Sequence, residues 1–544
     1  MNAQSADVVV IGAGHNGLIA AAYLAAAGQD VLVVERDEVP GGAVSTVERF
    51  PGYRVDRGSS AHIMIRHTPI IDELRLTDHG LHYLDCDPWG FAPATADGPA
   101  IVLHTDLDRT CASIAEACGQ RDADAYRTFV GVWAPRGRAL VRAFCGPPGP
   151  VAMARAFWGL PTRDGTTGRD AGGMLSREFL QSGDDLLDSW FTCERLKAAL
   201  AWFGAQSGPP MSEPGTAPMV GYAALLHDMP PGRAVGGSGA LTDALMSVLA
   251  THGARVRTGC AATAIRESPA GPTVELADGS AVRARRVVAA CHVLTTLDLL
   301  DGGGFDRATS DRWRRDIVVG NGIGMAVRVA ADALPQYAGL PDDLPEHGVH
   351  SALGLLVTDR AQLSLAHGQA AAGVLPDRPA LVAMSYSAID PTLAPPGRAS
   401  LTLWAQWHPR RLAGGRDWST TAGAATAGVL AEFERHAPGF GDGIRDVYTQ
   451  TPEDLETELG LRGGNIMHVE MSLPNMFTLR PHPDLAGRRV PGADGVILAG
   501  ASTHPGGGVN GAAGRAAAAM ILGTDTLRSR AAGALRRAVR GRRT

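Results

Sequence analysis

The chain begins with an alternation of apolar and polar segments that predicts a strand, a tight turn, a helix and a second strand. Apolar residues occupy positions 8–11, small residues with three glycines follow, and a second apolar run at 31–34 ends at two charged residues. A short apolar run before a glycine turn indicates a buried strand. Residues 8–29 carry no formal charge and are long enough to imitate a membrane span. The glycines among them favour the strand–turn–helix unit instead.

The three glycines have the spacing G-x-G-x-x-G, which is typical of dinucleotide binding. Gly12 permits the turn, Gly14 lets the backbone approach a pyrophosphate, and Gly17 lets the helix lie close to the sheet. The helix N-terminus then faces the phosphates. Glu35 follows the second strand, where a carboxylate accepts both ribose hydroxyls. A glycine turn without a ligand is the alternative, but the complete unit favours a dinucleotide.

A second glycine segment distinguishes among dinucleotides. Gly41 and Gly42 begin six residues after Glu35. A glycine pair there suits a second backbone approach to a long, flat ligand, for which NAD enzymes of this fold have no need.

A third glycine segment lies near the C-terminus. Residues 494–522 predict a buried strand, a glycine loop and a helix from about Val509. Amides at Gly507, Gly508 and Val509 would favour negative charge on a reduced flavin ring. Three separated segments that converge on one ligand imply FAD.

Composition excludes several classes of protein. The 544 residues are 45% hydrophobic and 19% charged, enough for a sizeable core in two or more domains. Fifty basic and 56 acidic residues give a net charge of −6, so no global basic field draws the chain onto nucleic acid. The seven cysteines include no C-x-x-C pair, and we expect inert thiols in a reducing cytoplasm. The histidines form no metal-binding pattern, and no basic region precedes the first apolar run, so we expect neither a metal site nor a signal peptide.

Several long stretches carry a resemblance to one known family. They include VVVIGAGHNGLIAAAYL, GGAVSTVERFPGYRVDRGSSAHIMIRH and GASTHPGGGVNGAAGR, within a region from about Asp7 to Gly523. The chain resembles the phytoene desaturase-like flavoproteins, which include carotene desaturases, carotenoid isomerases and desaturase-type beta-carotene ketolases. PGYRVDRGSSAH and SGPPMSEPGTAPMVG are most similar to the actinobacterial ketolases. The resemblance implies FAD as cofactor and a long apolar polyene, a carotenoid, as substrate.

The resemblance also implies an α/β fold in which a Rossmann-type FAD-binding domain, with a parallel sheet, is interleaved with a mixed α+β substrate-binding domain. The FAD domain is expected in three segments, 1–86, 231–295 and 480–524. The substrate domain is expected at 87–230, which is partly helical, and 296–479. The sequence is compatible with this division, because residues 236–265 predict a helix then a strand, and Asp278 and Gly279 predict a hairpin turn.

By the resemblance, the backbone of Ala262 would meet the adenine. The residues assigned to the cofactor are Gly12, Gly14, Gly17, Glu35, Arg36, Gly41, Gly42, Ala43, Ala262, Gly500, Ala501, Gly507, Gly508 and Val509.

Two other classes of flavoprotein fit the sequence less well. Residues 316–331 could be offered as a second nucleotide site, for NADPH, as in disulfide reductases. Their spacing is G-x-G-x-G and no acidic residue closes a second strand, so they predict a strand of the substrate domain. Flavin amine oxidases typically hold a lysine near the flavin. Lys197 is the only lysine of the chain and lies outside any flavin motif.

The absence of metal-ligand patterns narrows the chemistry. A ring ketone could be formed by a di-iron or haem centre, but neither ligand set is present in the sequence. Flavin would then supply the oxidation, through hydride abstraction from an allylic carbon, capture of water by the polyene cation, and a second two-electron oxidation. His504, Glu470 and His62 are the candidate catalytic residues, and His468 and Asn510 are further groups expected near the flavin. His504 could instead fix its loop, and Glu470 could pair with an arginine.

The expected activity is that of a beta-carotene ketolase, which forms a 4-keto product. This product is echinenone if one ring is oxidised and canthaxanthin if both are, and the sequence does not distinguish the two. A desaturase, an isomerase or a non-catalytic pigment carrier with FAD stays open. Most aromatic residues of the helical region are expected in the core and a minority along a substrate tunnel: Trp133, Phe144, Phe157, Trp158, Trp190, Phe191, Trp202 and Phe203.

The basic tail at 525–544 contains seven arginines and no acidic residue after Asp525. Basic residues near an anionic leaflet contribute roughly 1 kcal/mol each, so the tail could hold the protein at a membrane surface. A solvated tail is the alternative. We expect a cytoplasmic protein peripheral to the inner face of the cell membrane, and the sequence indicates no oligomeric state.

Overall fold

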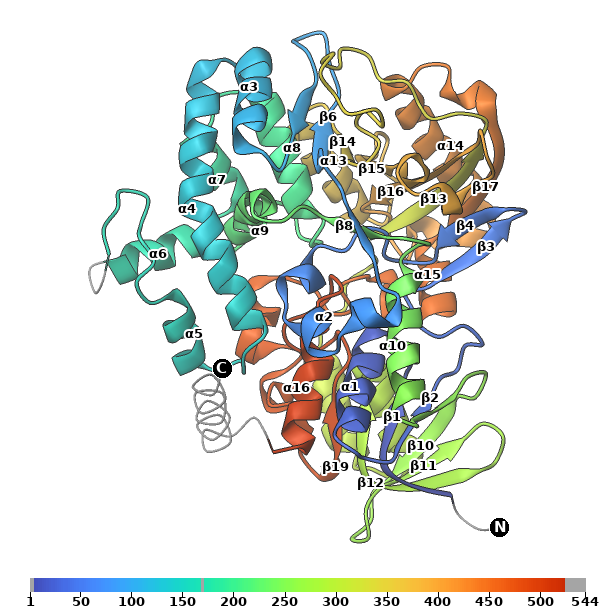
Figure 1. Ribbon diagram of the computed structural model, residues 1–544. Coiled ribbons are helices and arrows are strands. Elements are labelled where there is room, and N and C mark those ends of the chain that lie inside the picture. The colour runs from blue at the N-terminus through green and yellow to red at the C-terminus, as the bar shows by residue number, and fades with distance from the viewer. Residues whose placement is uncertain (1–3, 168–170, 524–544) are drawn as a thin grey trace.

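The computed structural model describes residues 4–167 and 171–523, and these form two large sheets, two sheets of two strands each, and helices around them (Figure 1). The basic tail at 525–544 lies outside the described residues. Among the helices of the described ranges, none combines the length and apolarity that a bilayer crossing requires.

The first sheet is built from segments that are far apart in the sequence. Its five parallel strands run in the order β19–β12–β1–β2–β9. Their bounds are Ala493–Leu498, Ala281–Ala289, Gln4–Ile11, Val31–Val34 and Arg255–Arg257. The hairpin β10 (Ala262–Arg266) and β11 (Thr273–Leu276) continues from β12, and β18 (Arg489–Val490) borders β19. The predicted parallel sheet is confirmed. The hairpin predicted from the turn at Asp278 and Gly279 is confirmed as well, and it consists of β11 and β12.

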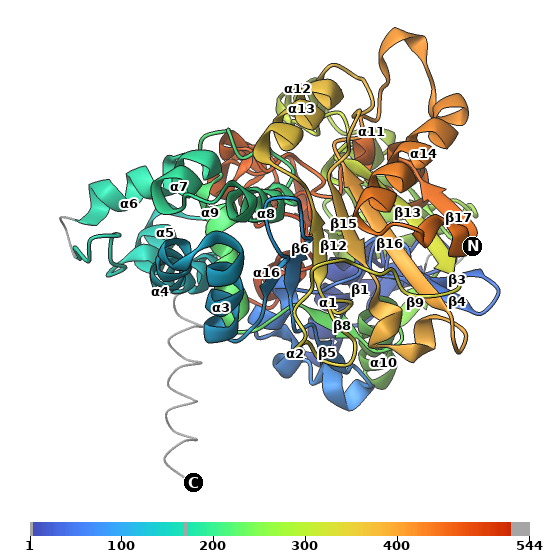
Figure 2. The same cartoon turned by 90° about the horizontal axis from the view of Figure 1, so that it is seen from above.

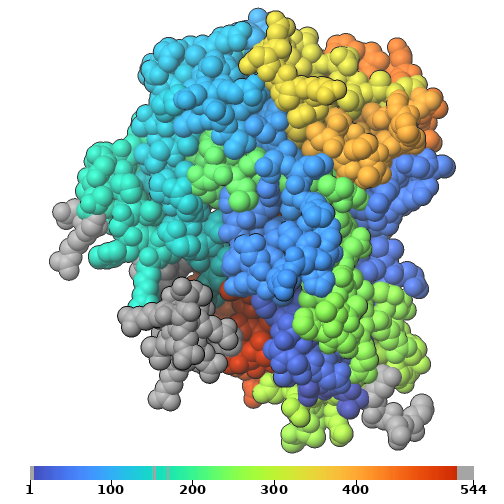
Figure 3. Space-filling model, in the orientation of Figure 1, coloured from blue at the N-terminus to red at the C-terminus, as the bar shows by residue number. Residues whose placement is uncertain are grey.

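Helices cover both faces of this sheet. Val8 and Val10 contribute to a core with α1 (His15–Ala26), α10 (Gly239–Thr251) and α16 (Ala512–Ile521). Val9 and Ile11 point to the opposite core, with α11 (Val293–Gly302) and α12 (Arg307–Asp316). This alternation follows from the two-residue period of a strand. The blue and red segments that carry α1 and α16 meet at the surface in the space-filling view (Figure 3).

The second sheet has seven strands in the order β17–β13–β16–β15–β14–β6–β7. Their bounds are Ile444–Gln450, Gly324–Ala331, Ala399–Gln406, Leu381–Met384, Leu353–Leu356, Gly90–Ala92 and Ile101–Leu103. All pairs are antiparallel except β14 with β6. The helix α14 (Trp418–His436) packs into the core of this sheet. The glycine-containing stretch 316–331 supplies β13, so the prediction that it forms a strand is confirmed.

A group of helices packs beside the second sheet. Its members are α3 (Leu107–Cys118), α4 (Gln120–Phe144), α5 (Pro150–Phe157), α6 (Ala171–Leu180), α7 (Gly183–Trp190), α8 (Glu194–Ala205) and α9 (Ala217–Gly221). Trp133, Phe191 and Trp202 lie in their common core, as expected. The Trp202 indole donates a hydrogen bond to the Leu381 carbonyl at 2.8 Å, which joins α8 to β15. In the view from above, α5 and α6 project to one side (Figure 2).

The remaining elements connect these parts. They are β3 (Thr46–Phe50), β4 (Tyr53–Asp56), α2 (Ile70–Glu73), β5 (Tyr83–Asp85), β8 (Gly232–Ala234), α13 (Arg360–Ala371) and α15 (Pro452–Leu459).

Three local expectations differ from the structure. The last helix begins at Ala512 rather than near Val509, because Val509 and Gly511 have φ angles of +52° and +70°, which a right-handed helix cannot contain. Helix α11 ends at Gly302, and Trp313 of α12 lies in the core of the first sheet, so that core extends beyond residue 295. A disulfide joins Cys118 to Cys193, whereas all the thiols were expected to be free. No spacing pattern indicates this pair, because 75 residues separate its members.

Candidate active site

The fold brings two glycine segments together at the carboxyl ends of β1 and β2. The amide of Gly41 donates a hydrogen bond to the Ala13 carbonyl at 2.8 Å, and Gly14 pairs with Gly41 as an isolated bridge. Parallel strands place ligands at this edge of a sheet. The first and second glycine segments therefore form one continuous backbone surface.

The room for a Cβ atom at each glycine distinguishes a glycine needed for packing from one that leaves the backbone open to a ligand. A Cβ atom on Gly17 would lie 2.0 Å from the Gly12 carbonyl oxygen, so this position must be glycine for α1 to approach the turn. A Cβ atom on Gly14 would meet no atom within 4 Å. Gly42 lies beside it, with 3.6 Å between its constructed Cβ and the Gly14 Cα. The opening at Gly14 is a cradle of the kind that a pyrophosphate needs.

Glu35 follows β2 and faces the glycine turn. Its Oε2 accepts a hydrogen bond from the Ala13 amide at 2.6 Å, and its Oε1 accepts one from the Asp37 amide at 3.0 Å. The Cys260 amide donates to the Glu35 carbonyl at 2.8 Å, and Ala262 begins β10 two residues later. Arg36 instead donates to the carbonyls of Thr457 and Glu458 in α15.

A cavity of about 400 Å³ lies between the first sheet's glycine segments and the second sheet. The cofactor side contributes His15, Ala43, Ala501, Gly507, Gly508, Val509 and Asn510. The substrate side is mostly apolar and includes Leu140, Phe144, Phe203, Met219, Leu353, Val382, Met384, Trp404, Met467 and Met476. Phe144 and Phe203 are thus the two of the eight singled-out aromatic residues that line it.

The candidate catalytic histidines lie outside this lining. His62 is buried, with Nδ1 2.7 Å from the Tyr83 hydroxyl and Nε2 2.9 Å from the Ser238 hydroxyl, so both ring nitrogens are occupied. His504 is buried and stacks near Phe144 and Phe477. Burial lowers the pKa of each of these imidazoles to about 3. Both therefore stay neutral at physiological pH.

Glu470 lines a different cavity, of about 220 Å³, together with Glu213. Burial, and then the charge of Glu213, raise the pKa of Glu470. No described arginine forms a salt bridge with Glu470. Glu470 therefore does not line the large cavity, although its neighbour Met471 lines both cavities.

Two histidines do line the large cavity. His468 was singled out from the sequence, and its Nδ1 is buried without a hydrogen-bond partner. His15 was not, although it occupies a variable position of the G-x-G-x-x-G fingerprint and could have been found there. Burial lowers the pKa of His15 to about 4 and that of His468 well below its ordinary value. The site therefore contains neutral imidazoles.

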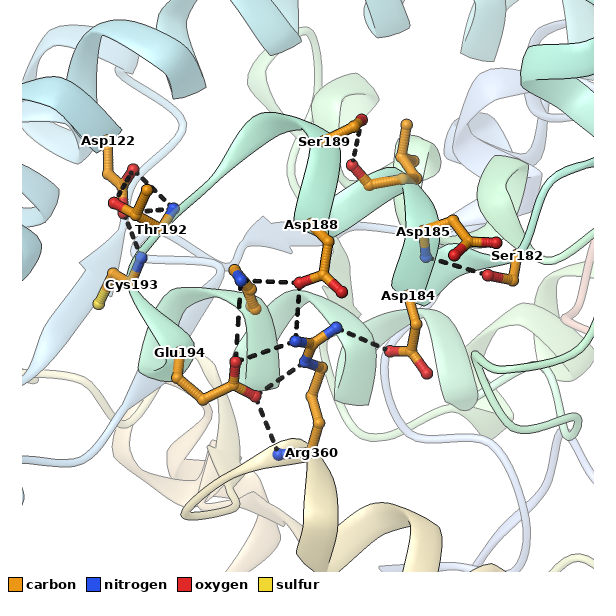
Figure 4. Close-up of polar contacts among 12 residues, drawn as sticks. Asp122, Ser182, Asp184, Asp185, Asp188, Ser189, Thr192, Cys193, Glu194 and Arg360 are labelled. Atoms are coloured by element: carbon orange, nitrogen blue, oxygen red, sulfur yellow. Dashed lines mark hydrogen bonds and ion pairs between the residues drawn. The ribbon is translucent and has the colours of Figure 1, made fainter.

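Lys197 lies among acidic side chains and not in the lining of the large cavity. Its Nζ donates to Asp188 Oδ1 at 2.7 Å, and it does not line the large cavity. Arg360 lies in the same cluster, between Asp184, Asp188 and Glu194 (Figure 4). This lysine is committed to a structural ion-pair network.

A buried ion pair joins β4, which follows the second glycine segment, to β8. The Arg233 guanidinium pairs with Asp56, which also accepts hydrogen bonds from the Ser238 amide and the Thr46 hydroxyl. Burial alone would raise the pKa of Asp56, but Arg233 and these hydrogen bonds hold it below the ordinary value. Both side chains are almost inaccessible.

We expect Asp56→Asn to lower the free energy of unfolding by about 3–5 kcal/mol, because Arg233 would be left as an uncompensated buried charge. The depressed pKa means that the pair stabilises the wild type fully above about pH 4–5, and that this contribution is lost as pH falls through the folded-state value. Urea titrations at several pH values measure both effects. Asp30→Asn, in an exposed pair with Arg255, is the matched control and should cost about 0–1 kcal/mol. Equal losses for the two variants would contradict this expectation.

The residues present fit FAD. The open cradle at Gly14, the carboxylate of Glu35 and the loop at 507–510 lie along one path that ends in a large cavity. Within the described residues, no group of three or more His, Cys, Asp or Glu side chains could hold a metal ion. Fold and site together define an FAD-dependent oxidoreductase.

Comparisons with known proteins agree with this class. Residues 10–74 match the model of the NAD(P)-binding Rossmann-like domain, and residues 158–296 match that of the flavin containing amine oxidoreductase family. Pyridine nucleotide-disulfide oxidoreductase domain-containing protein 2 of Rattus norvegicus is 33% identical over 95% of this chain and 93% of its own length. The chain belongs to the family of that protein.

More distant relatives extend the picture. Phytoene dehydrogenase of Streptomyces griseus is 27% identical, over 92% of each chain. A redesigned putrescine oxidase shares the fold with a TM-score of 0.61 and 15% identity, over 96% of this chain and 99% of its own. An oxidoreductase from Methanosarcina mazei shares it with a TM-score of 0.57 and 15% identity, over 93% and 97%.

The name of the relative from Rattus norvegicus refers to disulfide oxidoreductases, so the position of the disulfide in this chain needs to be compared with the flavin site. Cys118 and Cys193 lie at the end of α3 and the start of α8, and neither lines the large cavity. A thiol pair that exchanges electrons with a flavin needs to contact it. This disulfide is therefore not placed to exchange electrons with a flavin in the large cavity, and it joins α3 to α8.

Proposed function

We propose that the protein oxidises a long apolar polyene with FAD, and that it is a beta-carotene ketolase that forms a 4-keto product. The observation that carries this proposal is the mostly apolar cavity between the flavin-side glycine segments and the second sheet. The likeness to phytoene dehydrogenase supports a carotenoid as substrate. Apolar walls bind a hydrocarbon because its surface leaves water on entry.

When bound, FAD supplies two-electron oxidation. Conversion of a ring methylene and one water into a ketone releases four electrons and four protons, so two rounds are required. The chain's own residues hold the polyene and exclude bulk water, which protects a cation on the polyene from uncontrolled capture. A captured water becomes a strong acid. His468 Nδ1, which has no partner in the cavity wall, can accept its proton although the imidazole is a weak base.

Anaerobic mixing of the FAD-loaded protein with beta-carotene tests the proposal. We expect the flavin to be reduced within one turnover, with stoichiometric loss of beta-carotene. Because beta-carotene itself absorbs near 450 nm, the reduced flavin is measured at 600 nm by the bleaching of dichlorophenolindophenol added anaerobically. A pigment carrier would leave the flavin yellow, and that result would overturn the oxidation. The desaturase and isomerase alternatives are separated by the product.

We expect NADPH to leave the flavin oxidised under the same conditions. The stretch 316–331 forms a strand of the second sheet and not a second nucleotide-binding unit. Stopped-flow absorption at 450 nm measures this directly. Bleaching by NADPH at a rate that supports turnover would contradict it.

We also propose that the protein contacts the cytoplasmic face of the cell membrane, where carotenoids dissolve. Besides the tail, the helices α5 and α6 present large apolar side chains to solvent. Val151, Trp158, Met174 and Leu180 are 68%, 77%, 45% and 50% exposed. Phe157 and Phe179 pack edge to face at 5.0 Å and connect the two helices. A clustered apolar surface of this kind is typical of interfacial binding.

Sedimentation with vesicles that contain anionic lipid tests this contact. We expect the double variant Trp158→Ser and Leu180→Ser, and a chain that ends at Asp525, each to lower the bound fraction. Val447→Ser, at a 38% exposed residue of β17 on the opposite side of the protein from α5 and α6 (Figure 1), is the control and should bind as the wild type does. If both altered proteins bind vesicles as the wild type does, neither the apolar side chains of α5 and α6 nor the tail contributes to membrane binding.

A further inference from the structure

One charged side chain faces the large cavity. Arg328 is the single charged residue of β13, and it is 2% exposed. Val327 and Val329 point into the outer core of the second sheet, and the two-residue period of the strand turns Arg328 to the opposite face. Thr402 lies directly across from it on β16, and Gln450 ends β17. All three residues line the cavity.

Arg328 is the buried arginine that lines the large cavity, and it has no carboxylate partner. It donates to the Thr402 hydroxyl at 2.8 Å and to Gln450 Oε1 at 3.4 Å, and no carboxylate of the described residues forms a salt bridge with it. Arg233 and Arg136 pair with acidic residues. Arg480 donates to several backbone carbonyls, and Arg488 donates to the Thr503 hydroxyl and the His504 carbonyl. None of these four lines the large cavity.

The charges around Arg328 leave it without compensation. Asp56 is the carboxylate whose charge stabilises it, but that side chain is already paired with Arg233. Arg49 and Arg233 act in the opposite direction. Burial lowers the pKa of Arg328 to about 10, so the guanidinium still carries its charge at physiological pH. A buried charge without a counterion is costly to the fold.

We propose that Arg328, with Thr402 and Gln450, forms a subsite for a carboxylate at one end of a polyene ligand. A guanidinium has five N–H donors, and two are used by the neighbouring side chains. Three remain for a ligand, and a carboxylate is the group that fits their planar arrangement with two oxygens. A pure hydrocarbon would fill the cavity and leave this charge unpaired.

This inference rests on the proposed function only in taking the cavity as the substrate cavity. It adds that a polyene with an acidic end, such as a cleaved carotenoid acid or a conjugated fatty acid, binds more tightly than a neutral polyene of equal length. The binding experiment below involves no turnover. If beta-carotene does not reduce the flavin, the carboxylate subsite is therefore still testable. If the acid and its ester bind equally, the proposal of ketolase activity still stands.

The test compares cis-parinaric acid with its methyl ester as ligands of the FAD-loaded protein, followed by the fluorescence of the conjugated chain. We expect the acid to bind at least about tenfold more tightly than the ester, in line with a charge-assisted pair. Arg328→Met should bind both equally. Arg328→Lys should keep part of the preference, because an ammonium retains the charge without the fork. Arg398→Met, which removes a surface guanidinium paired with Asp332, is the control and should keep the full preference.

Equal affinities of acid and ester for the wild type would overturn the proposal, and so would a preference that survives in Arg328→Met. FAD content and the visible spectrum of each variant show whether its fold is intact. If Arg328→Met loses FAD, Arg328→Gln replaces it, since its amide can still reach Thr402 and Gln450 without a charge. The same equalisation of the two affinities is then expected.

Discussion

Glu35→Arg is expected to reduce the FAD content of the purified protein to about a tenth of wild type or less. The substitution removes the acceptor of the Ala13 amide and places a cation where ribose hydroxyls need an acceptor. Hydrogen bonds to a charged group contribute about 1.5–3 kcal/mol each, and loss of one corresponds to roughly a 10- to 100-fold weaker complex. The ratio of absorption at 450 and 280 nm after desalting measures the occupancy.

Glu38→Arg provides the matched control for this prediction. It makes the same charge reversal three residues later, at an exposed position. We expect it to retain full FAD occupancy and an unchanged midpoint of urea unfolding. Full occupancy in Glu35→Arg itself would falsify the role of this carboxylate.

The second large effect concerns the product. Supplied with beta-carotene and an electron acceptor, the enzyme should form the mono-ketone echinenone before any diketone, because each ring requires its own two rounds of oxidation. If a cation is captured by water, the new oxygen comes from solvent. Labelled water should therefore appear in the hydroxyl intermediate, which must be analysed because a ketone exchanges its oxygen with solvent.

Each other result would indicate a different reaction. Label from dioxygen in the hydroxyl intermediate would exclude capture of water. Loss of hydrogen without gain of oxygen would identify a desaturase, and a change of double-bond geometry alone would identify an isomerase. Mass spectrometry of the extracted pigments distinguishes all of these.

The cofactor side of the site could be predicted because its signals are local. The turn at Gly12, the close approach at Gly17 and the carboxylate of Glu35 belong to one unit of about thirty residues, in which spacing alone specifies geometry. The start of α16 could not be placed to within three residues, because the left-handed backbone at Val509 depends on contacts of the whole loop.

The substrate side depends on strand register, which the sequence does not encode locally. Arg328 meets Thr402 and Gln450 only because β13 lies between β16 and β17. The same holds for the catalytic candidates. The sequence predicts His62 and His504 near the flavin, but both are buried outside the lining of the large cavity, in contacts with Ser238 and Ala143 that only the folded chain brings together.

The order of strands in the first sheet constrains how the protein is made. Strand β1 lies between β2 and β12, and α1 packs against α16, so the N-terminal unit must wait for partners synthesised much later. At ribosomal rates of 5–20 residues per second, on the order of 25 to 100 s separate Gly12 from Ala512. During that interval the apolar edge of β1 is open to aggregation and no complete nucleotide pocket exists. Flavin loading is therefore a late, post-translational event, and chaperone supply rather than FAD supply should limit the yield of active protein in a heterologous host.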